Sequence, residues 1–440
     1  MTGVQTCALP ISGLQQVVEY IENLHFSEED VVYLRSKRLF TEEFLEYLLH
    51  FRFRGDIYAM KEGTVMYPNE PVITVVAPLI DAQLIETTIL LEINHQSLIA
   101  TKTNRIVQAA NGKPVSDFGA RRAHNVDAAV YGARAAYIGG AAGTATVLAG
   151  KMFHIPISGT MAHSWVMTFD SEYDAFKAYA ESYPDGTVLL VDTYDVLKSG
   201  VPNAIRTARE VLEPMGKKLI GIRLDSGDLA YLSKEARKML DEAGLSDCMI
   251  VASNSLDEYT ISSLNRQGAK IDSYGVGERL ITSSSTPVFG AVYKLVAIQK
   301  DGKFIPKIKI SETAEKITNP GIKEVYRVYD ENGKAVADYL AVKGEQIRDL
   351  EPVRYVDPVN YWKNRSFVGC RFKKLQVPVF EKGKRIYDLP DIEEIRQYVK
   401  DQLENEIWEE EQRFENAHTH YLDMSPAMFE LKMSLLHEEN

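Results

Sequence analysis

Hydrophobic residues in the first quarter of the chain follow a helical spacing and then an alternating one. Between Leu14 and Leu49 apolar side chains recur every three or four positions, which predicts two short helices. Residues 55–78 alternate between apolar and polar side chains and are broken at Glu-Gly-Thr and Pro-Asn-Glu-Pro, a pattern typical of antiparallel strands. A further helix is expected over roughly residues 80–110.

The middle of the chain repeats one pattern, an apolar strand that ends in polar residues. This pattern recurs every 25 to 30 residues, at 188–195, 218–228, 249–257 and 273–280. Stretches with one apolar helical face, 204–212 and 229–240, separate the first three strands. Strands this apolar are buried on both faces, so the pattern predicts a parallel β/α sheet, open or closed as a barrel, with ligands at the strand ends.

After about Pro287 the alternation of strands and helices stops. Residues 292–310 and 324–340 predict two β-hairpins that turn at Lys-Asp-Gly-Lys and Glu-Asn-Gly-Lys. Residues 392–416 predict an acidic amphipathic helix that packs on the body of the protein, since its negative charge is unsuited to a membrane anchor.

Composition narrows the class of protein. A chain of 440 residues, with 45% hydrophobic and 25% charged residues, is globular and allows two or three domains. The net charge of -12, without a basic cluster, argues against a nucleic-acid partner. The chain contains no apolar run of about 18 residues, so no membrane span is predicted. Its three cysteines are scattered, which fits a reducing cytoplasm.

The first twelve residues have an apolar patch but no basic start, so they do not form a secretory signal. They resemble the translation of a sequencing-adapter tail. We therefore expect residues 1–12 to be a non-native scar and the true chain to start near Gly13, the alternative being an unusual native tail.

Five polar clusters fall at predicted strand ends: 116–122, 159–166, 223–228, 253–258 and 274–280. In the last, Gly275 and Gly277 allow close backbone approach and offer N–H groups to a phosphate, although a plain glycine turn is the structural alternative. Arg121 and Arg122 suit phosphate or carboxylate, and Phe118 offers a face to a flat ring; a salt bridge to a core carboxylate is the alternative for the arginines.

Asp225 and Asp228 suit ribose hydroxyls or a magnesium ion carried by a diphosphate, while Asp228 could equally cap a helix. His163 lies between small residues that would leave its ring accessible at a strand end, and a buried core histidine is the alternative. His418 and His420 have no nearby cysteine or third histidine, so we predict structural roles for both.

Several segments together resemble one enzyme family, the nicotinate phosphoribosyltransferases of the bacterial type. They are SDFGARRAHNVDAAVYGARAAYIGG, GTMAHSWV, LLVDTYDVLKSGVPNAI, GIRLDSGDLAYLSKEARKMLDEAG, ASNSLDEY, GVGERLITS and KITNPG. The resemblance runs from about Gly13 to the C-terminus. It implies an irregular TIM-like α/β barrel plus a mixed α/β flanking domain built from the N- and C-terminal segments, the type II phosphoribosyltransferase fold, in a homodimer with active sites near the interface.

The resemblance also implies a reaction, in which nicotinate and phosphoribosyl pyrophosphate give nicotinate mononucleotide and pyrophosphate, coupled to hydrolysis of ATP. His163 is then the histidine that ATP phosphorylates. Phe118 stacks on the pyridine ring, Arg121 holds the product phosphate, and Arg223 with Ser164 recognises the carboxylate.

In the same comparison Asp225 meets the ribose or the magnesium diphosphate, and the loop with Gly275 and Gly277 binds the 5′-phosphate. Asp228 and Asn254 complete the expected substrate-binding set.

The sequence departs from the family pattern in three places. His124 replaces a common Gln, and Ala145-Thr146 replaces Ser-Asn. The family's opening helix and strand are not recognisable, so the expected domains are 13–115 without those elements, the barrel 116–290, and the returning hairpins and helical tail 291–440. We expect a chain without that front to bind nicotinate poorly and to expose a sheet edge.

Three other functions compete with this interpretation. A nicotinamide phosphoribosyltransferase needs an acidic partner for the amide, and residues 143–150 contain no carboxylate. A quinolinate phosphoribosyltransferase needs no phosphohistidine, unlike the segment around His163. A non-catalytic metabolite-binding relic is disfavoured because the site residues are intact, namely Arg121, His163, Arg223, Asp225 and Gly277.

Overall fold

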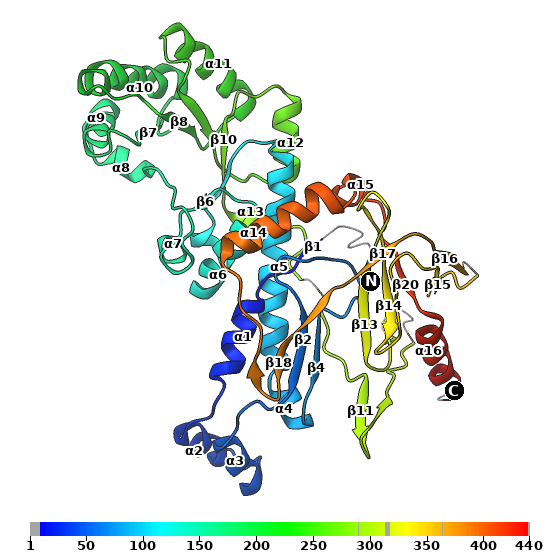
Figure 1. Ribbon diagram of the computed structural model, residues 1–440. Helices are drawn as coiled ribbons and strands as arrows, with labels where there is room; N and C mark the ends of the chain where they lie inside the picture. Colours follow the sequence, from blue (N-terminus) through cyan, green and yellow to red (C-terminus); the bar gives the residue numbers. More distant parts are fainter. Residues whose placement is uncertain (1–8, 289, 313–316, 363, 439–440) are drawn as a thin grey trace. The chain divides into compact units, whose positions relative to one another are not determined.

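The computed structural model describes residues 9–288, 290–312, 317–362 and 364–438 (Figure 1). The chain forms two compact units, one from Met1–Ser97 with Val288–Asn440 and the other from Leu98–Pro287. The expected flanking domain from both ends of the chain is therefore confirmed. Helix α5 (Glu86–Ala109) starts in the first unit and continues into the second, ahead of the predicted boundary at residue 115. The predicted scar at 1–12 stays a prediction; residues 1–8 lie outside the described residues.

The N-terminal part of the first unit begins with a short strand that holds residues 9–12 in the fold. Leu9 pairs with Met66, and Ile11 and Ser12 are fully buried. The elements up to the second unit are β1 (Leu9–Pro10), α1 (Leu14–Asn23), α2 (Glu28–Ser36), α3 (Glu42–Leu49), β2 (Asp56–Met60), β3 (Val65–Met66), β4 (Ile73–Val76), α4 (Leu79–Leu84) and α5.

The region 14–49 contains three helices, so the prediction of two was wrong. The second and third helices each begin at a polar capping residue, and the hydrophobic spacing does not show where these helices start. Ser27 opens α2 with a capping box, in which its hydroxyl and the carboxylate of Asp30 each accept a backbone N–H, and Thr41 accepts the N–H of Phe44 at the start of α3.

The C-terminal part of the first unit returns as β-hairpins, as predicted. Its elements are β11 (Ala297–Lys300), β12 (Lys303–Pro306), β13 (Lys323–Tyr329), β14 (Ala335–Val342), β15 (Val353–Val356), β16 (Asn364–Phe367), β17 (Arg371–Lys374), β18 (Gln376–Glu381), β19 (Lys384–Arg385), α14 (Ile392–Asp401), α15 (Glu409–Gln412), β20 (Leu422–Met424) and α16 (Pro426–Glu438). Both turns predicted from Asp-Gly and Asn-Gly join antiparallel partners, β11 with β12 and β13 with β14.

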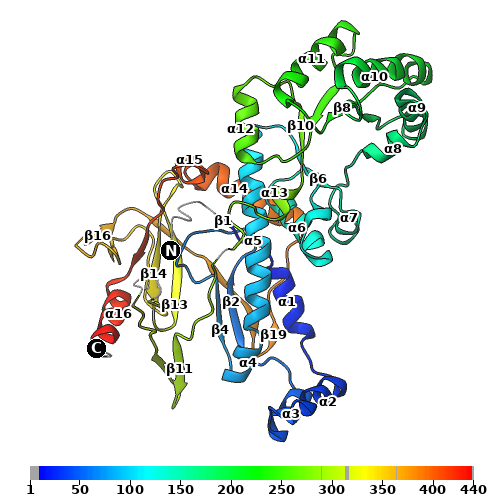
Figure 2. The same cartoon turned by 180° about the vertical axis from the view of Figure 1, so that it is seen from behind.

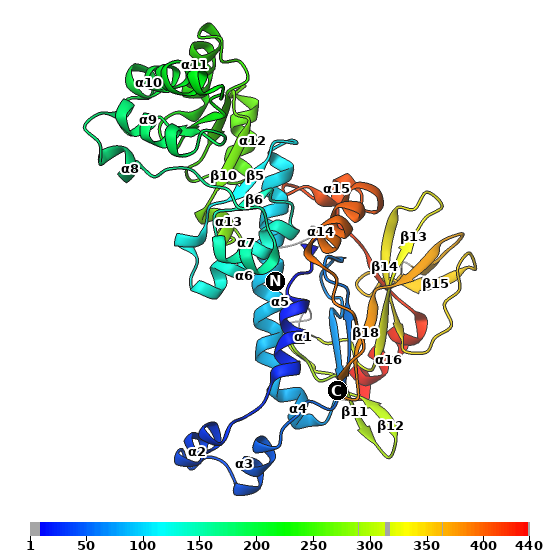
Figure 3. The same cartoon turned by 60° about the vertical axis from the view of Figure 1, so that its left-hand side comes forward.

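Two sheets organise this unit, in the orders β19-β18-β2-β4 and β16-β15-β20-β14-β13-β17. In the first, β18 pairs antiparallel with β2, with Gln376 opposite Met60, so a strand from the end of the chain completes a sheet started at its beginning. In the second, helix α16 lies against β14 and β15 (Figure 3).

The predicted acidic helix over 392–416 is interrupted. Helix α14 ends in a π-helical turn, Gln402–Glu406, and Ile407 is extended and buried before α15 begins. The side chain of Gln402 donates to the carbonyl of Gly63 at 2.8 Å and accepts from the N–H of Val65 at 3.0 Å. These bonds and the burial of Ile407 beside Val65 fix the break, and they confirm that the tail packs on the body.

The second unit contains the predicted parallel sheet. Its elements are β5 (Val115–Asp117), α6 (Val126–Ile138), β6 (Gly143–Thr144), α7 (Val147–Phe153), α8 (His163–Met167), α9 (Glu172–Ser182), β7 (Val188–Leu190), α10 (Val201–Thr207), β8 (Gly221–Leu224), α11 (Leu229–Glu242), β9 (Met249–Ala252), α12 (Glu258–Arg266), β10 (Ser273–Val276) and α13 (Glu278–Ile281).

All six strands of this sheet are parallel, in the order β6-β5-β10-β9-β8-β7. An isolated parallel bridge between Thr144 and Ile157 extends it beyond β6. Helices α9, α10, α11 and α12 surround the strands (Figures 1 and 2). Ile222, Leu224, Ile250 and Val276 are fully buried, as expected for strands covered on both faces.

This parallel sheet with its surrounding helices confirms the predicted α/β architecture and agrees with the irregular TIM-like barrel that the resemblance implies. Parallel strands present their carboxyl ends at one edge, which positions the site described below. Among the described residues, no helix has the length and apolar character needed to cross a membrane.

Candidate functional site

The carboxyl ends of the parallel strands bring most of the predicted site residues to one edge of the second unit. Phe118 follows β5, Asp225 follows β8, Asn254 follows β9, and Gly277 follows β10. These positions lie along the same edge of the sheet, because β5, β10, β9 and β8 are consecutive parallel neighbours. Residues that are far apart in the chain therefore share one site.

His163 begins the short helix α8 and faces two carboxylates. Its Nε2 lies 3.9 Å from Asp192 Oδ1 and 3.8 Å from Asp225 Oδ2. The imidazole is 38% exposed, which excludes the alternative of a fully buried core histidine, whereas the Asp192 side chain is 1% exposed. His163 Nδ1 and Asp192 Oδ1 are both buried without a hydrogen-bond partner among the described residues.

Arg223 on β8 is held by three hydrogen bonds from three different nitrogens. Its Nε donates to Ser253 Oγ at 2.8 Å, one terminal nitrogen donates to Thr160 Oγ1 at 2.8 Å, and the other donates to Asp225 Oδ1 at 2.9 Å. Ser253 also donates to Asp225 Oδ1. A guanidinium fixed at every nitrogen keeps one orientation, and its side chain remains 16% exposed.

The ring of Phe118 lies between a glycine and an arginine. The guanidinium carbon of Arg223 is 5.6 Å from the centre of the ring, within the range of a cation–π contact. A Cβ added at Gly275 would lie 2.5 Å from the ring carbon Cε2, so only glycine allows the ring to occupy this place. Gly275 therefore also provides the space that the ring of Phe118 occupies.

Asp117, which precedes Phe118, is completely buried and links two strand-end loops. Its Oδ1 accepts the N–H of Gly119 at 2.8 Å and its Oδ2 accepts the hydroxyl of Thr144 at 2.8 Å. Thr144 Oγ1 in turn accepts the N–H of Thr146 at 2.9 Å. Burial raises the pKa of Asp117, and the bonds from Thr144 and Gly119 only partly oppose this.

The anion-binding candidates lie near the end of β10. Gly277 precedes α13, and a Cβ there would lie 3.1 Å from the carbonyl oxygen of Phe118, tighter than an ordinary contact. Arg121 and Arg122 lie in a single 3-10 turn and are exposed. Arg122 Nε is 3.4 Å from the exposed Glu278, whereas no core carboxylate pairs with Arg121 among the described residues.

Three other predicted residues are exposed. Asp228 caps α11 by accepting the N–H of Tyr231 at 3.0 Å, which is the structural alternative raised from the sequence. Asn254 has a positive φ of 97°, a conformation that asparagine tolerates better than most residues. Ser164 is exposed on α8 next to His163.

Sequence reasoning did not select Asp192, Ser253, Thr160 and Asp117. Asp192 lies in a polar cluster at the end of β7, so the strand-end rule alone could have found it. Its Oδ2 accepts the N–H of Asp225 at 3.1 Å and the hydroxyl of Ser226 at 2.5 Å. Nothing in the sequence marks Ser253 or Thr160 as partners of Arg223, because that contact depends on the order of the strands.

The tail histidine His420 belongs to the first unit and lies in a buried cluster of charges, as the structural prediction expects. Its Nδ1 is 3.1 Å from both carboxylate oxygens of Glu411, and its ring stacks on Tyr67 with centroids 3.7 Å apart. Among the described residues, no group of three or more histidine, cysteine or acidic side chains could hold a metal ion by itself.

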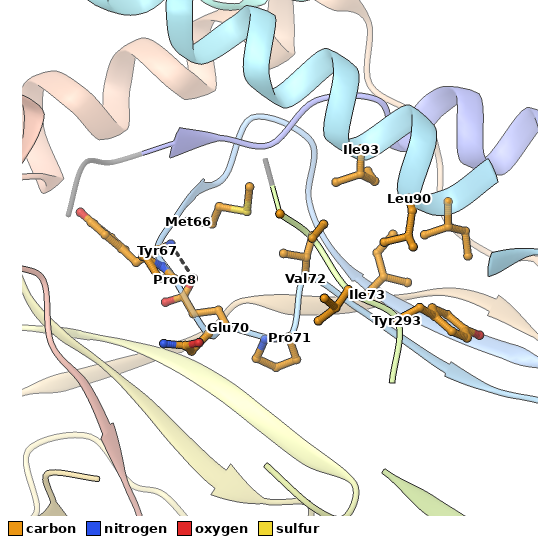
Figure 4. A pocket seen from close by; sticks show the side chains of 15 residues that line it. Met66, Tyr67, Pro68, Glu70, Pro71, Val72, Ile73, Leu90, Ile93 and Tyr293 are labelled. Atoms are coloured by element: carbon orange, nitrogen blue, oxygen red, sulfur yellow. Dashed lines mark hydrogen bonds between the residues drawn. The ribbon is translucent and has the colours of Figure 1, made fainter. Parts of the chain in front are cut away.

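The first unit contains a cavity of about 240 Å³, which differs from this site because its lining is mainly apolar (Figure 4). Met66, Val72, Ile73, Leu90 and Ile93 are among the apolar residues that line it, and the figure shows these side chains around the cavity. None of the predicted site residues lines it. The strand-end cluster of the second unit is therefore the candidate active site.

Comparison with known proteins identifies the family to which this arrangement belongs. Three family descriptions match in order: the nicotinate phosphoribosyltransferase N-terminal domain over residues 6–94, the nicotinate phosphoribosyltransferase family over 114–333, and the C-terminal domain over 322–432. A nicotinate phosphoribosyltransferase of Bacillus subtilis is 48% identical over 97% of this chain and 86% of its own length.

Two further relatives agree with this assignment. Nicotinate phosphoribosyltransferase pncB2 of Mycobacterium tuberculosis is 42% identical over 89% of this chain and 78% of its own length. The crystal structure of human nicotinic acid phosphoribosyltransferase superposes with a TM-score of 0.87 at 26% identity, covering 98% of this chain and 93% of that one. The chain therefore belongs to the nicotinate phosphoribosyltransferase family of enzymes.

Proposed function

We propose that this protein joins nicotinate to phosphoribosyl pyrophosphate, giving nicotinate mononucleotide and pyrophosphate, with hydrolysis of ATP coupled to the reaction, as the first step of NAD salvage from nicotinate. The observation that carries the proposal is the constellation at the strand ends. There His163 faces Asp192 and Asp225, while Arg223 is fixed beside the ring of Phe118. Family membership supports the choice of substrates.

In the proposed site, Phe118 stacks on the pyridine ring and Arg223, with Ser164, recognises the carboxylate. A fixed guanidinium suits this task, because its fork matches a carboxylate and its three hydrogen bonds leave little orientation to be lost on binding. Nicotinamide should bind less well, since the exposed Ala145 offers its amide no acceptor side chain.

The remaining roles follow the charges of phosphoribosyl pyrophosphate. Arg121 and the backbone around Gly275 and Gly277 are proposed to hold the 5′-phosphate. Asp228 and Asn254, exposed at the ends of β8 and β9, are proposed to contact the ribose. Asp228 would do so while it caps α11.

Magnesium fits this site as an ion that arrives with the diphosphate. Mg²⁺ is usually held by one or two carboxylates together with substrate oxygens and water, so a closed protein cage is not required. Asp225 and Asp192 are the side chains that would hold it, and the buried Asp192 Oδ1 lacks another partner among the described residues. When bound, the ion would neutralise charge on the leaving diphosphate.

His163 is proposed to accept the γ-phosphoryl group of ATP. A bond forms between an imidazole nitrogen and phosphorus, the bond to the bridging oxygen breaks, and ADP leaves; water later cleaves the phosphoimidazole to release phosphate. Asp192 and Asp225 would hold the imidazole and take part in moving its proton.

The glycosyl step is proposed to pass through an oxocarbenium-like transition state. The pyridine nitrogen forms a bond to the anomeric carbon as the bond to the diphosphate breaks. In this step Asp225 would stabilise positive charge on the ribose, and Phe118 would fix the approach of the ring. Orientation and charge stabilisation would then supply most of the rate enhancement.

A homodimer in the cytoplasm is the proposed state of the enzyme. Helix α7 exposes Val147, Leu148 and Met152, at 63%, 48% and 48%, a strip that a second copy could cover. A reducing compartment would keep Cys248 and Cys370, both unpaired, as thiols. Light scattering of the purified protein tests the dimer.

The decisive experiment incubates the protein with nicotinate, phosphoribosyl pyrophosphate and magnesium, with and without ATP, and detects nicotinate mononucleotide by mass. A parallel tube contains nicotinamide. Product from nicotinate, stimulated by ATP, supports the proposal. Product from nicotinamide alone would contradict the proposal. Absence of product from both substrates would favour the interpretation as a non-catalytic relic, or as an enzyme impaired by its altered N-terminal segment.

A further inference from the structure

We propose that Asp117, acting through Thr144, is a positioning residue that sets the width of the slot for the pyridine ring; this inference rests on the proposed function. The pair joins the loop after β5, which carries Phe118, to the loop after β6, which carries Ala145 and Thr146. Neither side chain is exposed to a ligand, since Asp117 is 0% and Thr144 is 1% exposed.

The hydrogen bonds of Asp117 are distributed so that each oxygen serves a different loop. Oδ1 accepts from the backbone of Gly119, one residue beyond Phe118, and Oδ2 accepts from the hydroxyl of Thr144. The main-chain oxygen of Asp117 also accepts the N–H of Ala145 at 2.8 Å. One residue therefore fixes both loops through its side chain and its backbone.

Thr144 transmits this constraint to the next residues. Its hydroxyl donates to Asp117 and accepts from the N–H of Thr146, so both of its hydrogen-bonding directions are used within the site. Its carbonyl accepts the N–H of Ser158 at 2.9 Å, which ties in the segment that leads to His163. Without the hydroxyl, the N–H of Thr146 would lose its acceptor.

The opposite side of Phe118 is already fixed. Its N–H donates to the carbonyl of Val276 at 2.8 Å, and its ring lies on Gly275. The ring therefore cannot move toward β10, and the remaining freedom is in the loops that Asp117 and Thr144 hold. Burying a carboxylate costs free energy of folding. The two hydrogen bonds that Asp117 accepts from the loops, both 2.8 Å long, offset part of this cost.

Thr144→Val tests the link with a side chain of nearly the same shape. We expect KM for nicotinate to rise about 10- to 100-fold, because small misplacements in a site have effects of that size. KM for phosphoribosyl pyrophosphate and phosphorylation of His163 by ATP, measured without nicotinate, should stay within about twofold of wild type, since the hydroxyl of Thr144 bonds to Asp117 and Thr146 and, among the described residues, not to His163, Asp225 or Arg223.

Thr207→Val is the matched control. Thr207 is also fully buried in the second unit, but its hydroxyl donates to the carbonyl of Asn203 within α10, at 2.8 Å, and to no site residue among those described. Its substitution should change melting temperature as much as Thr144→Val does and leave KM for nicotinate unchanged. Equal loss of nicotinate affinity in both variants would show that general destabilisation, rather than positioning, is responsible.

Asp117→Asn provides a second variant that removes a buried charge. The amide can still accept from Gly119, but its nitrogen cannot accept the hydroxyl of Thr144. We expect the melting temperature to be maintained while KM for nicotinate rises as in Thr144→Val, and the double variant should add little to either single one.

Unchanged KM for nicotinate in both Asp117→Asn and Thr144→Val would overturn the inference, provided that the wild-type protein forms product. Failure of the wild-type protein to form product from nicotinate would instead contradict the proposed function.

Discussion

The imidazole of His163 and the carboxylate of Asp225 face each other across the strand ends, with Nε2 and Oδ2 3.8 Å apart. This spacing is longer than a hydrogen bond, so the ring is not locked to Asp225. Asp192 lies at a similar distance, 3.9 Å, on a side chain that is itself buried. The histidine thus lies between two carboxylate groups and is 38% exposed, which agrees with its proposed role as the acceptor of a phosphoryl group.

Replacing His163 by alanine should abolish stimulation by ATP. Without an imidazole no phosphohistidine can form, so ATP hydrolysis that depends on nicotinate and phosphoribosyl pyrophosphate is expected to disappear. Product formation without ATP should remain, because Arg223 and Phe118 are untouched. The measurement is nicotinate mononucleotide formed with and without ATP, and persistent stimulation in the variant would show that the phosphohistidine assignment is wrong.

Asp192→Asn refines this prediction. The amide keeps an acceptor for Asp225 N–H and Ser226, so the loop should stay in place, but the negative charge beside the imidazole is lost. We expect the rate of His163 phosphorylation to fall about 10²- to 10⁴-fold, the usual contribution of a group that assists proton movement. Rapid mixing with radiolabelled ATP measures this rate directly.

The fold could be predicted from the sequence where one local pattern dominates. The buried strands β7 to β10 and the hairpins at Asp301-Gly302 and Asn332-Gly333 are examples. The predicted number of N-terminal helices was wrong because Ser27 and Thr41 start new helices within a stretch whose apolar spacing is continuous. The break before Ile407 depends on Gln402 reaching residues more than 330 positions earlier, which no local pattern contains.

The site shows the same division. Strand-end residues such as Phe118 and Asp225 could be selected because a parallel sheet brings its carboxyl ends together. The partners that orient them could not, because the contact of Arg223 with Ser253 and Thr160 depends on strand order and on a segment outside the sheet. Gly275 was assigned to phosphate binding, whereas the structure adds a steric reason, the ring of Phe118.

Gly275→Ala tests that steric reason. The added methyl group would lie 2.5 Å from the Phe118 ring, so the ring must move. We expect KM for nicotinate to rise about tenfold or more, with a smaller effect on kcat, because the stacking face is displaced. Steady-state kinetics with varied nicotinate provide the measurement.

Gly186→Ala is the control for this substitution, since a Cβ at Gly186 has no atom within 4 Å. It should leave KM unchanged. A second test combines Gly275→Ala with Phe118→Ala. If the methyl group acts by displacing the ring, it should have little further effect once the ring is absent, and a full additive effect would contradict this explanation.

Lys102→Met should destabilise the second unit strongly. Lys102 and Glu258 are 2% and 1% exposed, and the lysine Nζ is 2.7 Å from the carboxylate. Removing the lysine leaves a buried charge without its partner, which typically costs about 3–5 kcal/mol. Urea denaturation followed by circular dichroism measures the loss of stability.

The double variant Lys102→Met with Glu258→Leu separates the lost charge pair from lost packing. When both charges are replaced by apolar side chains of similar size, buried pairs are often neutral in stability. The double variant should therefore recover most of the loss. A double variant as unstable as the single one would show that the charge pair is not the cause, and that lost packing or the lost hydrogen bond from Lys102 to Ser285, 3.1 Å long, accounts for the effect.

The buried charges around His420 predict that stability falls at alkaline pH. Burial by itself lowers the pKa of His420, but Asp338 and Glu411 outweigh it, so the net pKa is raised above its ordinary value of 6.5. The protonated form is therefore favoured in the folded protein. Its contribution is complete below about pH 6.5 and is lost as the pH rises through the folded pKa, at about 1.4 kcal/mol for each unit that separates the two pKa values.

Two variants assign this pH dependence, because Glu70 faces the same cluster. Burial and Asp338 raise the pKa of Glu70 well above its usual range, so ionisation of Glu70 would also lower stability as the pH rises. His420→Gln should remove the part of the decline in melting temperature that lies above pH 6.5, and Glu70→Gln should remove the part that begins at lower pH.

Arg327 is fully buried and bonded to Asp338 at 2.8 and 2.9 Å. It keeps its charge throughout this pH range, so it cannot produce either part of the decline. A melting temperature that declines identically in wild type and His420→Gln would show that His420 does not titrate in the folded protein over this range.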